Sequence, residues 1–263
     1  MSHKRRQYTS EISQKQWQRI KWMLPVQQGA GRPVELDMRM VINAILYVLV
    51  TGCQWRNVPN DYPNPNSVYY HYRKWCRDGT WQRMNRQMVF LERRRVGRFA
   101  RPSAGIVDSQ SVKVSDQGGV SGYDGHKKIK GRKRHVLVDT QGNLLEVAVT
   151  AANATDREGA SVVLSKVERL MVVRLLKIWA DQAYQGDLEV WFAQQWTIQL
   201  DIVRRDPDQQ GFVVLPRRWV VERTFAWLGN FRRLSKDDER DTISSEGFIY
   251  LASIYTMLNR LNA

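Results

Sequence analysis

The sequence predicts a mixed α/β domain, with helices flanking its sheet, that follows an all-helical segment. Three observations support this prediction. Apolar residues in the first hundred positions recur at helical spacing, three strand-like segments come in succession between residues 104 and 150, and helical and strand-like segments alternate from residue 156 onward. Consecutive strands followed by alternation indicate a mixed sheet with helices packed on it. The residue pattern changes from helical to strand-like near residues 99–102. We therefore divide the chain into a helical domain, 1–100, and an α/β domain, 101–263.

The positive charge of the chain is concentrated in its N-terminal part. The 263 residues include 41 Lys and Arg and 26 Asp and Glu, which give a formal net charge of +15. Of these, 18 basic and only 6 acidic residues fall within 1–100, so that part carries a net charge of +12. A strongly basic segment attracts a polyanion, and double-stranded DNA is the leading candidate.

Neither a membrane nor a secreted location fits the sequence. It contains no run of 18 apolar residues, and its basic start lacks the apolar stretch of a secretory signal. Cys53 and Cys76 fit a reducing cytosol better than a disulfide framework. Together with His71 they match no zinc-binding spacing, so we expect two separate thiols. The sequence predicts a cytoplasmic protein that is not associated with a membrane.

Four helices are expected in the helical domain. They are a short helix capped by Ser13 and stopped by Pro25, a periodic helix over 37–50 ended by Gly52, a helix over 68–77 capped by Ser67, and a helix from about 81 to 95. The third helix follows a Pro- and Asn-rich turn in a helix-turn-helix-like pattern. Its Tyr70, Arg73 and Lys74 offer the contacts that phosphates and base edges need. The alternative is an ordinary helical domain with core tyrosines, but the net charge favours DNA contact.

The α/β domain is expected to alternate strands and helices after its first three strands. The expected strands are 104–114, 134–138, 144–150, 175–180 and 198–203; the helices are 156–170, 186–195, 216–234 and 243–262; turns fall at 139–143 and 206–211. Pro216 stands where a first-turn proline is tolerated. This order of elements is the signature of the ribonuclease-H-like fold.

Residues 115–133 are expected to form a loop that becomes strongly basic near its end. Six cations fall within the eight residues 127–134. The side chains that we expect to contact the DNA backbone are Lys127, Lys128, Lys130, Arg132 and Lys133. The alternative is a solvated loop without a partner. Its position beside the first strand of the α/β domain favours DNA.

Three acids stand out by their positions. Asp108 directly follows the apolar Ile106 and Val107, where a charge is costly unless it is paired or binds a metal. Asp181 directly follows an apolar strand, at the carboxyl end where α/β sheets place ligands. Glu222 lies on the expected 216–234 helix. If the first and fourth strands are adjacent and parallel, the two aspartates lie side by side and the late helix brings Glu222 to them.

Such a set of carboxylates predicts a magnesium site. Three converging carboxylates without basic partners repel each other, and divalent cations relieve the repulsion. Two Mg²⁺ ions, with Mn²⁺ as an alternative, would activate a water or a 3′-hydroxyl and stabilise the leaving oxygen in phosphodiester displacement. Taken alone, Glu222 among arginines would indicate a surface ion pair. Because Asp108 and Asp181 are expected beside it, we expect Glu222 to be a metal ligand.

The remaining acids have simpler explanations. Asp139 begins a Gly-containing turn, so a turn aspartate is the expectation. Asp156 stands at a helix start, where an N-cap is expected. Asp206 and Asp208 flank a proline in a turn.

Several stretches resemble the DDE transposases of bacterial insertion sequences, the insertion-sequence-five type within the insertion-sequence-four/five superfamily. They are residues 105–113, 122–135, 180–186 and 217–228, with residues 52–56 and 67–75 resembling the helical DNA-binding region of that group. The resemblance spans nearly the whole chain, with its motifs in the right order. It implies that Asp108, Asp181 and Glu222 are the first, second and third metal-binding carboxylates.

The sequence departs from one pattern of that superfamily, a Tyr, Arg, Glu and Lys set around the glutamate. Arg218 matches the arginine, four residues before Glu222. Leu215 takes the tyrosine position and Gly229 the lysine position. A phosphate contact is then expected from Arg218 and from Arg232 or Arg233.

The function that this resemblance implies is DNA transposition. The protein is expected to bind terminal inverted repeats, cleave phosphodiester bonds at the ends of its element and join the 3′-hydroxyl strand ends to target DNA. Two ends must be held together, so a homodimer in a synaptic complex is expected. The alternatives are a stand-alone ribonuclease-H-like nuclease and a non-catalytic sequence-specific DNA-binding protein.

Overall fold

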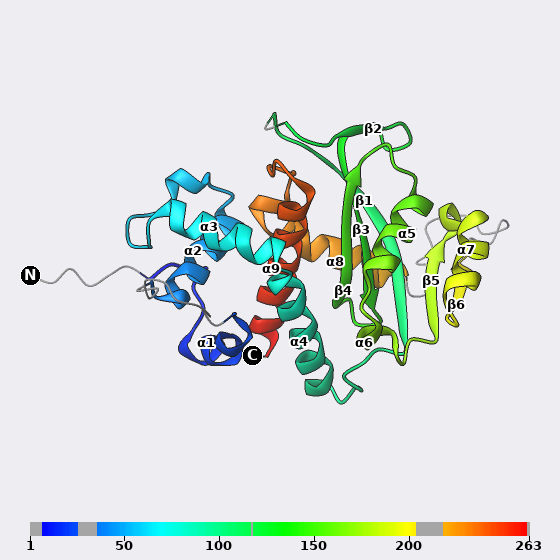
Figure 1. Ribbon diagram of the computed structural model, residues 1–263, viewed down its shortest axis with the longest axis horizontal. Helices are drawn as coiled ribbons and strands as arrows, with labels where there is room; N and C mark the ends of the chain where they lie inside the picture. The colour runs from blue at the N-terminus through cyan, green and yellow to red at the C-terminus, as the bar shows by residue number, and fades with distance from the viewer. Residues whose placement is uncertain (1–6, 26–35, 117, 204–217, 262–263) are drawn as a thin grey trace, which may run out of the picture.

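The computed structural model describes residues 7–25, 36–116, 118–203 and 218–261 of the chain, and Figure 1 shows their arrangement. The N-terminal part is helical, as predicted. Its helices are α1 (Gln14–Ile20), α2 (Met38–Thr51), α3 (Pro65–Arg77) and α4 (Thr80–Arg95), with 3₁₀ turns at Lys21–Met23 and Trp55–Asn57.

Local signals explain where these helices begin and end. Ser13 caps α1 in a reciprocal capping box, and Gly52, with φ +71°, ends α2. The prediction for α3 is wrong by three residues at its start. Asn64, not Ser67, accepts the first backbone N–H, and Pro65 occupies the first helical turn because it needs no hydrogen-bond partner there.

The α/β part is built on one six-stranded sheet. Its strands are β1 (Ala104–Lys113), β2 (Gly122–Asp124), β3 (Ile129–Asp139), β4 (Leu144–Ala151), β5 (Lys177–Asp181) and β6 (Gln199–Val203). The order across the sheet is β4-β3-β1-β5-β6, with β2 paired to the start of β3. β3 runs antiparallel to β1 and β4, whereas β1, β5 and β6 are parallel. This is the mixed sheet of the predicted ribonuclease-H-like fold.

Helices cover the sheet on both faces. They are α5 (Asp156–Lys166), α6 (Arg169–Val172), α7 (Asp187–Gln195), α8 (Arg218–Gly229) and α9 (Thr242–Arg260), with 3₁₀ turns at Gln182–Tyr184 and Arg232–Leu234. In Figure 1, α5 lies on one side of the sheet and α8 and α9 on the other, with α9 between the sheet and the N-terminal helices.

Two expectations for the α/β part are wrong in detail. The basic stretch expected as a loop contains β2 and the first residues of β3, so the second long strand begins at Ile129 rather than at Arg134. The helix expected over 216–234 ends at Gly229, and a separate 3₁₀ turn follows. The turn at 206–211 and Pro216 lie outside the described residues. Part of the expected 156–170 helix is the separate α6.

One apolar core runs through the molecule. It extends from α1 through the N-terminal helices and α9 into the sheet. Phe248 of α9 packs against the Tyr72 ring, with centroids 4.4 Å apart, and stacks on Trp55. The Tyr72 hydroxyl donates to the Ser244 carbonyl at 2.5 Å. In the part of the chain that is described, no helix is both long and apolar enough to cross a membrane.

Candidate active site

The two aspartates lie at the same level on neighbouring strands. β1 and β5 are parallel, and Ile106 is paired in register with Trp179. Asp108 and Asp181 each come two residues beyond that pair, Asp108 in the middle of β1 and Asp181 at the carboxyl end of β5. They line one small cavity together with Arg218 and apolar side chains of the sheet and α8. The two aspartates were expected to lie side by side if their strands are adjacent and parallel, and β1 and β5 are both.

Arg218 connects the aspartate pair to Glu222. Its Nη2 lies 3.4 Å from the Asp181 carboxylate, and its Nε lies 3.3 Å from the Glu222 carboxylate one helical turn later. The expectation of carboxylates without a basic partner is therefore wrong. Glu222 is more than half exposed, and it forms the ion pair that its arginine-rich neighbourhood indicates.

The three carboxylates are not gathered around one point. Within residues 7–25, 36–116, 118–203 and 218–261, no group of three or more His, Cys, Asp or Glu side chains is close enough to hold a metal ion. Arg218 supplies the positive charge between Asp181 and Glu222. A divalent cation would have to take its place there.

The environment of Asp108 makes its carboxyl unusually basic. Burial raises its pKa to about 6, and the nearby charge of Asp181 acts in the same direction. The Ser109 N–H, which donates to Asp108 at 2.7 Å, and the positive charges of Arg218 and Lys127 act against this rise. A bound cation would favour the ionised form, so proton and metal compete for this carboxylate.

The donor set suits a hard divalent ion. Asp108 and Asp181 offer carboxylate oxygens from two rigid strands, and Glu222 offers another from a half-exposed side chain within reach of the same arginine. Carboxylate oxygens are the ligands that Mg²⁺ and Mn²⁺ prefer. The residues present therefore fit the ion that the sequence predicts.

A polar network supports the strand that carries Asp108. The Ser109 hydroxyl donates to Asp156 at 2.6 Å, and the buried Lys133 ammonium lies 3.2 Å from Asp156 and 3.6 Å from Asp124. Burial would raise the pKa of Asp156, but the Ser109 hydrogen bond and the Lys133 charge outweigh it and lower the pKa. Asp156 is thus not the helix cap that was expected, since Thr155 caps α5.

Tyr184 lies next to the same network, and sequence reasoning assigned it no role. Its side chain is fully buried, and burial, together with the charges of Asp108, Asp156 and Asp181, raises its pKa well above the usual value. The nearby Ser109 side chain acts against this rise. The one feature of the sequence that points to a role for Tyr184 is its place three residues after Asp181.

Six of the predicted DNA-contact side chains are exposed. They are Tyr70, Lys74, Lys127, Lys128, Lys130 and Arg232. Tyr70 has 62% of its surface accessible although it is a large aromatic residue. Lys127 also reaches the Ser109 carbonyl at 3.3 Å, so it stands at the edge of the carboxylate site. These residues are available to a polyanion.

Three other predicted contacts are buried, which corrects the prediction. Arg132 is fully enclosed, and its Nη1 lies 3.0 Å from Asp237 and 2.7 Å from the Glu239 carbonyl. Lys133 is held by its two aspartates. Arg233 is paired with Glu239 at 2.5 Å. Their charges are paired with groups inside the protein, because buried cations require partners.

Arg73 has a structural partner as well. Its Nη2 lies 2.9 Å from Asp241, the residue that caps α9, and its Nη1 lies 3.2 Å from the Tyr69 hydroxyl. It therefore ties α3 to the start of α9 while remaining partly exposed.

Neither cysteine forms a disulfide, and Asp139 lies in the predicted turn. Cys53 and Cys76 are both free. Burial raises the pKa of the Cys76 thiol to about 12, so it stays protonated and unreactive. Asp139 begins the turn between β3 and β4, and its side chain is fully buried.

Two family models match the chain in succession. Residues 12–85 match the model described as "Putative transposase of IS4/5 family". Residues 100–258 match the model described as "Transposase DDE domain". The second match covers more than half of the chain and includes β1, β5 and α8, the elements that carry Asp108, Asp181 and Glu222.

A curated relative points the same way. The chain is 29% identical over 140 residues to "Putative transposase for insertion sequence element IS402" of Burkholderia cepacia. The matched segment covers 50% of this chain and 64% of that protein.

Two solved structures are similar at a greater distance. They are "Crystal structure of the Mos1 mariner paired end complex with Mn" and "Crystal structure of a pre-cleavage Mos1 transpososome". Each is 10% identical with a TM-score of 0.31, and they cover 94% of this chain and 84% and 83% of their own chains. At that score they support no structural argument. The match to the family model over residues 100–258 shows the family: this chain belongs to the transposases with a DDE domain.

Proposed function

We propose that the protein is the transposase of an insertion sequence. It binds the terminal inverted repeats of its element, cleaves phosphodiester bonds at the element ends and transfers the 3′-hydroxyl strand ends to target DNA. One observation carries this proposal. Asp108 and Asp181 lie at the same level on neighbouring parallel strands, and Arg218 links that pair to Glu222 in a chain of this family.

The three carboxylates are the proposed metal ligands. Asp108, Asp181 and Glu222 would hold Mg²⁺, with two ions expected and Mn²⁺ able to replace them. When bound, such ions activate a water or 3′-hydroxyl and stabilise the departing oxygen of the cleaved phosphodiester. The ionised carboxylates then serve as ligands, while Arg218 exchanges its carboxylate partners for the phosphate backbone.

Exposed basic and aromatic side chains form the proposed DNA surface. Tyr70 and Lys74 of α3 are candidates for end recognition, and Lys127, Lys128 and Lys130 for backbone contacts next to the carboxylates. Because two element ends have to be joined, we propose a homodimer as the working assembly. With this function, we expect the protein to act on DNA in the bacterial cytoplasm, at the nucleoid.

The test uses duplexes that carry the inverted repeats flanking the coding sequence. Asp108→Asn, Asp181→Asn and Glu222→Gln should each abolish Mg²⁺-dependent cleavage and strand joining, because each removes one anionic ligand. Each variant should still bind the end duplex, because the proposed recognition surface lies elsewhere. Gel assays of cleaved and joined products and fluorescence anisotropy of binding measure the two properties separately.

Asp116→Asn is the matched control, since Asp116 is an exposed acid of the same domain. It should cleave and join like the unaltered protein. Cleavage without any joining would identify a stand-alone nuclease instead. Binding without metal-dependent cleavage, in the unaltered protein, would identify a non-catalytic DNA-binding protein.

A further inference from the structure

The turn between β3 and β4 contains a buried ion pair that reaches into the N-terminal helices. Asp139 at the start of the turn is fully buried, and so is most of Arg93 of α4. Arg93 Nη1 lies 2.5 Å from the Asp139 carboxylate. Burying two charges is costly, and the pair is stable only if its remaining polar atoms are also satisfied.

Asp139 satisfies its other lone pairs within the turn. Its Oδ1 accepts from the backbone N–H groups of Gln141 at 2.8 Å and Asn143 at 2.9 Å. Its Oδ2 also accepts from the Asn143 side-chain amide at 3.0 Å. A carboxylate with this many donors fixes the shape of the turn, because moving any one segment breaks a charge-assisted hydrogen bond.

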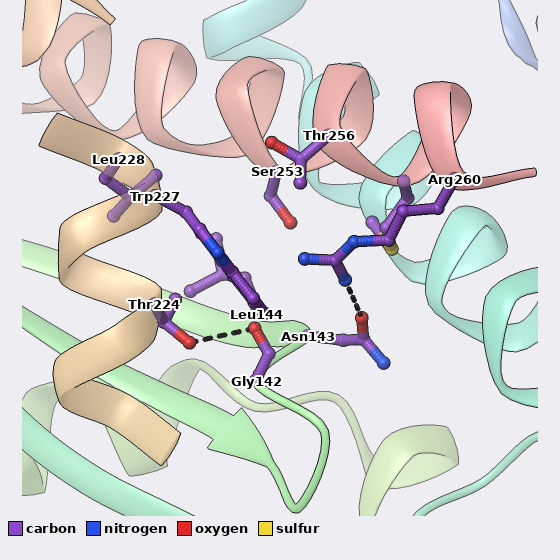
Figure 2. A pocket seen from close by; sticks show the side chains of 10 residues that line it. Gly142, Asn143, Leu144, Thr224, Trp227, Leu228, Ser253, Thr256 and Arg260 are labelled. Atoms are coloured by element: carbon purple, nitrogen blue, oxygen red, sulfur yellow. Dashed lines mark hydrogen bonds between the residues drawn. The ribbon is translucent and has the colours of Figure 1, made fainter. Parts of the chain in front are cut away.

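The fixed turn presents two carbonyl oxygens to α8. The Gln141 carbonyl accepts from Arg223 Nη2 at 3.0 Å. The Thr224 hydroxyl shares its one proton between the Gly142 carbonyl at 3.0 Å and the Val220 carbonyl of its own helix at 3.1 Å. Figure 2 shows the contact between Thr224 and Gly142 beside a small cavity between the turn, α8 and α9. Arg223 and Thr224 directly follow Glu222 in the chain.

The close approach of the turn to α8 depends on a glycine. Gly142 has φ +82°, and a side chain there would come within 2.7 Å of the Thr224 hydroxyl oxygen and 3.0 Å of the Trp227 ring. Arg223 lies between the rings of Trp219 and Trp227, at 4.5 and 4.6 Å from their centroids. Those two rings belong to the same helix, so they orient the Arg223 side chain, and rotation of α8 is opposed by its hydrogen bonds to Gln141 and Gly142.

Glu222 itself has little to hold it. Its side chain is 55% exposed, and among the described residues its ion-pair partner is Arg218, on the same helix. An exposed pair of this kind contributes little to position. The buried Val221 anchors α8 on one side of Glu222 in the chain, and the two residues that hydrogen-bond to the turn follow it on the other.

We propose that the β3–β4 turn sets the position of Glu222 through α8, and that Asp139 and Thr224 are positioning residues for the metal site. The proposal rests on the proposed role of Glu222 as a metal ligand. Since Arg93 belongs to α4, the turn also links the last N-terminal helix to the catalytic helix.

The experiment replaces the Thr224 hydroxyl and measures metal uptake without DNA. Thr224→Val keeps the side-chain shape but removes the donor to Gly142. Its dissociation constant for Mn²⁺, measured by calorimetry on the full chain, should rise by roughly tenfold, as for other outer partners of metal ligands. Thr224→Ser, which retains a hydroxyl, should bring the constant back.

Thr256→Val is the matched control. Thr256 lines the same cavity, but its hydroxyl donates at 2.8 Å to the Ala252 carbonyl of its own helix. It should leave the Mn²⁺ constant unchanged. A lower melting temperature of Thr224→Val with an unchanged constant, or equal increases in both threonine variants, would overturn the proposal.

The ion pair is tested by a double replacement that avoids leaving a lone buried charge. Arg93→Gln with Asp139→Asn should weaken Mn²⁺ binding as Thr224→Val does; retained affinity in a folded double variant would overturn the role of Asp139. Metal binding also separates this proposal from the proposed function. A chain that binds Mn²⁺ but cuts no DNA refutes only the function, whereas one that binds no Mn²⁺ refutes both.

Discussion

Arg132 shows that a basic residue next to a candidate active site can belong to the interior. In the sequence it is one of six cations in eight residues. In the structure it is fully enclosed, and its guanidinium also reaches the Ser245 hydroxyl and the Arg240 carbonyl at 2.9 Å each. It joins β3 to the segment that leads into α9. Its role is therefore to hold two distant segments together.

A pair of substitutions on β3 separates the structural cations from the proposed DNA contacts. Arg132→Gln leaves Asp237 buried without its cation and should lower the free energy of unfolding by about 3–5 kcal/mol. Lys130→Gln changes an exposed side chain and should leave stability within about 0.5 kcal/mol. Urea denaturation measures both, and anisotropy with end duplex should show a weaker salt dependence for the Lys130 variant. The reverse pattern would restore Arg132 as a DNA contact.

The sequence could predict which acids stand next to apolar strand residues but not what partners them. Asp108 follows the apolar Ile106 and Val107 within β1, and Asp181 ends the apolar β5, so their positions could be inferred from hydrophobicity alone. The pairing of Arg218 with Asp181 joins α8 to β5 and could not be inferred, because no sequence spacing reports it. Asp156 was assigned to a helix cap for the same reason, since Ser109 and Lys133 are distant in the chain.

The packing of α5 against β3 depends on one glycine facing one histidine. His135 is fully buried, and a methyl group added at Gly159 would overlap its ring. Burial lowers the pKa of His135 to about 4, so the ring is neutral at physiological pH and packs as a largely apolar group. This contact sets how closely α5 approaches the strand that pairs with β1.

Gly159→Ala should therefore destabilise the protein although alanine is the better helix former. Helix propensity alone would add about 1 kcal/mol of stability. Overlap with the His135 ring should outweigh this and give a net loss of about 1–3 kcal/mol. Ser161→Ala, at a partly exposed site on the same helix, is the control and should stay within about 0.5 kcal/mol. A stabilised Gly159 variant would show that α5 can move away from β3 freely.

Elements with a strong period were predictable, and elements made by tertiary partners were not. The 14-residue α2 carries eight buried residues and its own cap and glycine stop, so its bounds were predicted within one residue. The start of β3 looked like a basic loop because its cations hide the strand pattern. Those cations are tolerated in a strand only because carboxylates and carbonyls from elsewhere in the chain meet them.

The whole molecule is organised around its last helix. α9 packs against α2, α3 and α4 on one side and against β4 on the other. Besides Phe248, it contributes Asn259, whose side-chain oxygen accepts from Gln16 of α1 at 2.9 Å. The N-terminal helices thus share their core with a segment that comes some 150 residues later.

A fragment of residues 1–100 should not fold on its own. Without α9 it would expose the Tyr72 and Trp55 surfaces that Phe248 covers, and each large apolar side chain left in water costs about 1.5–3 kcal/mol. Thermal melts followed by circular dichroism should show no cooperative transition for the fragment. The full chain should unfold in one transition. A cooperative melt of the fragment would show that the helical part is an autonomous domain.

The position of α9 also bears on what happens while the protein is being made. The ribosome releases α9 after the N-terminal helices and the sheet, so those helices have an incomplete core until α9 is made. A product shortened by a frameshift or a premature stop before residue 242 would lack the surface that closes α2, α3 and α4. Such a product would be open to proteolysis rather than persist as an intact competitor for the same DNA. A cell carrying damaged copies of the gene would then accumulate few DNA-binding remnants from them.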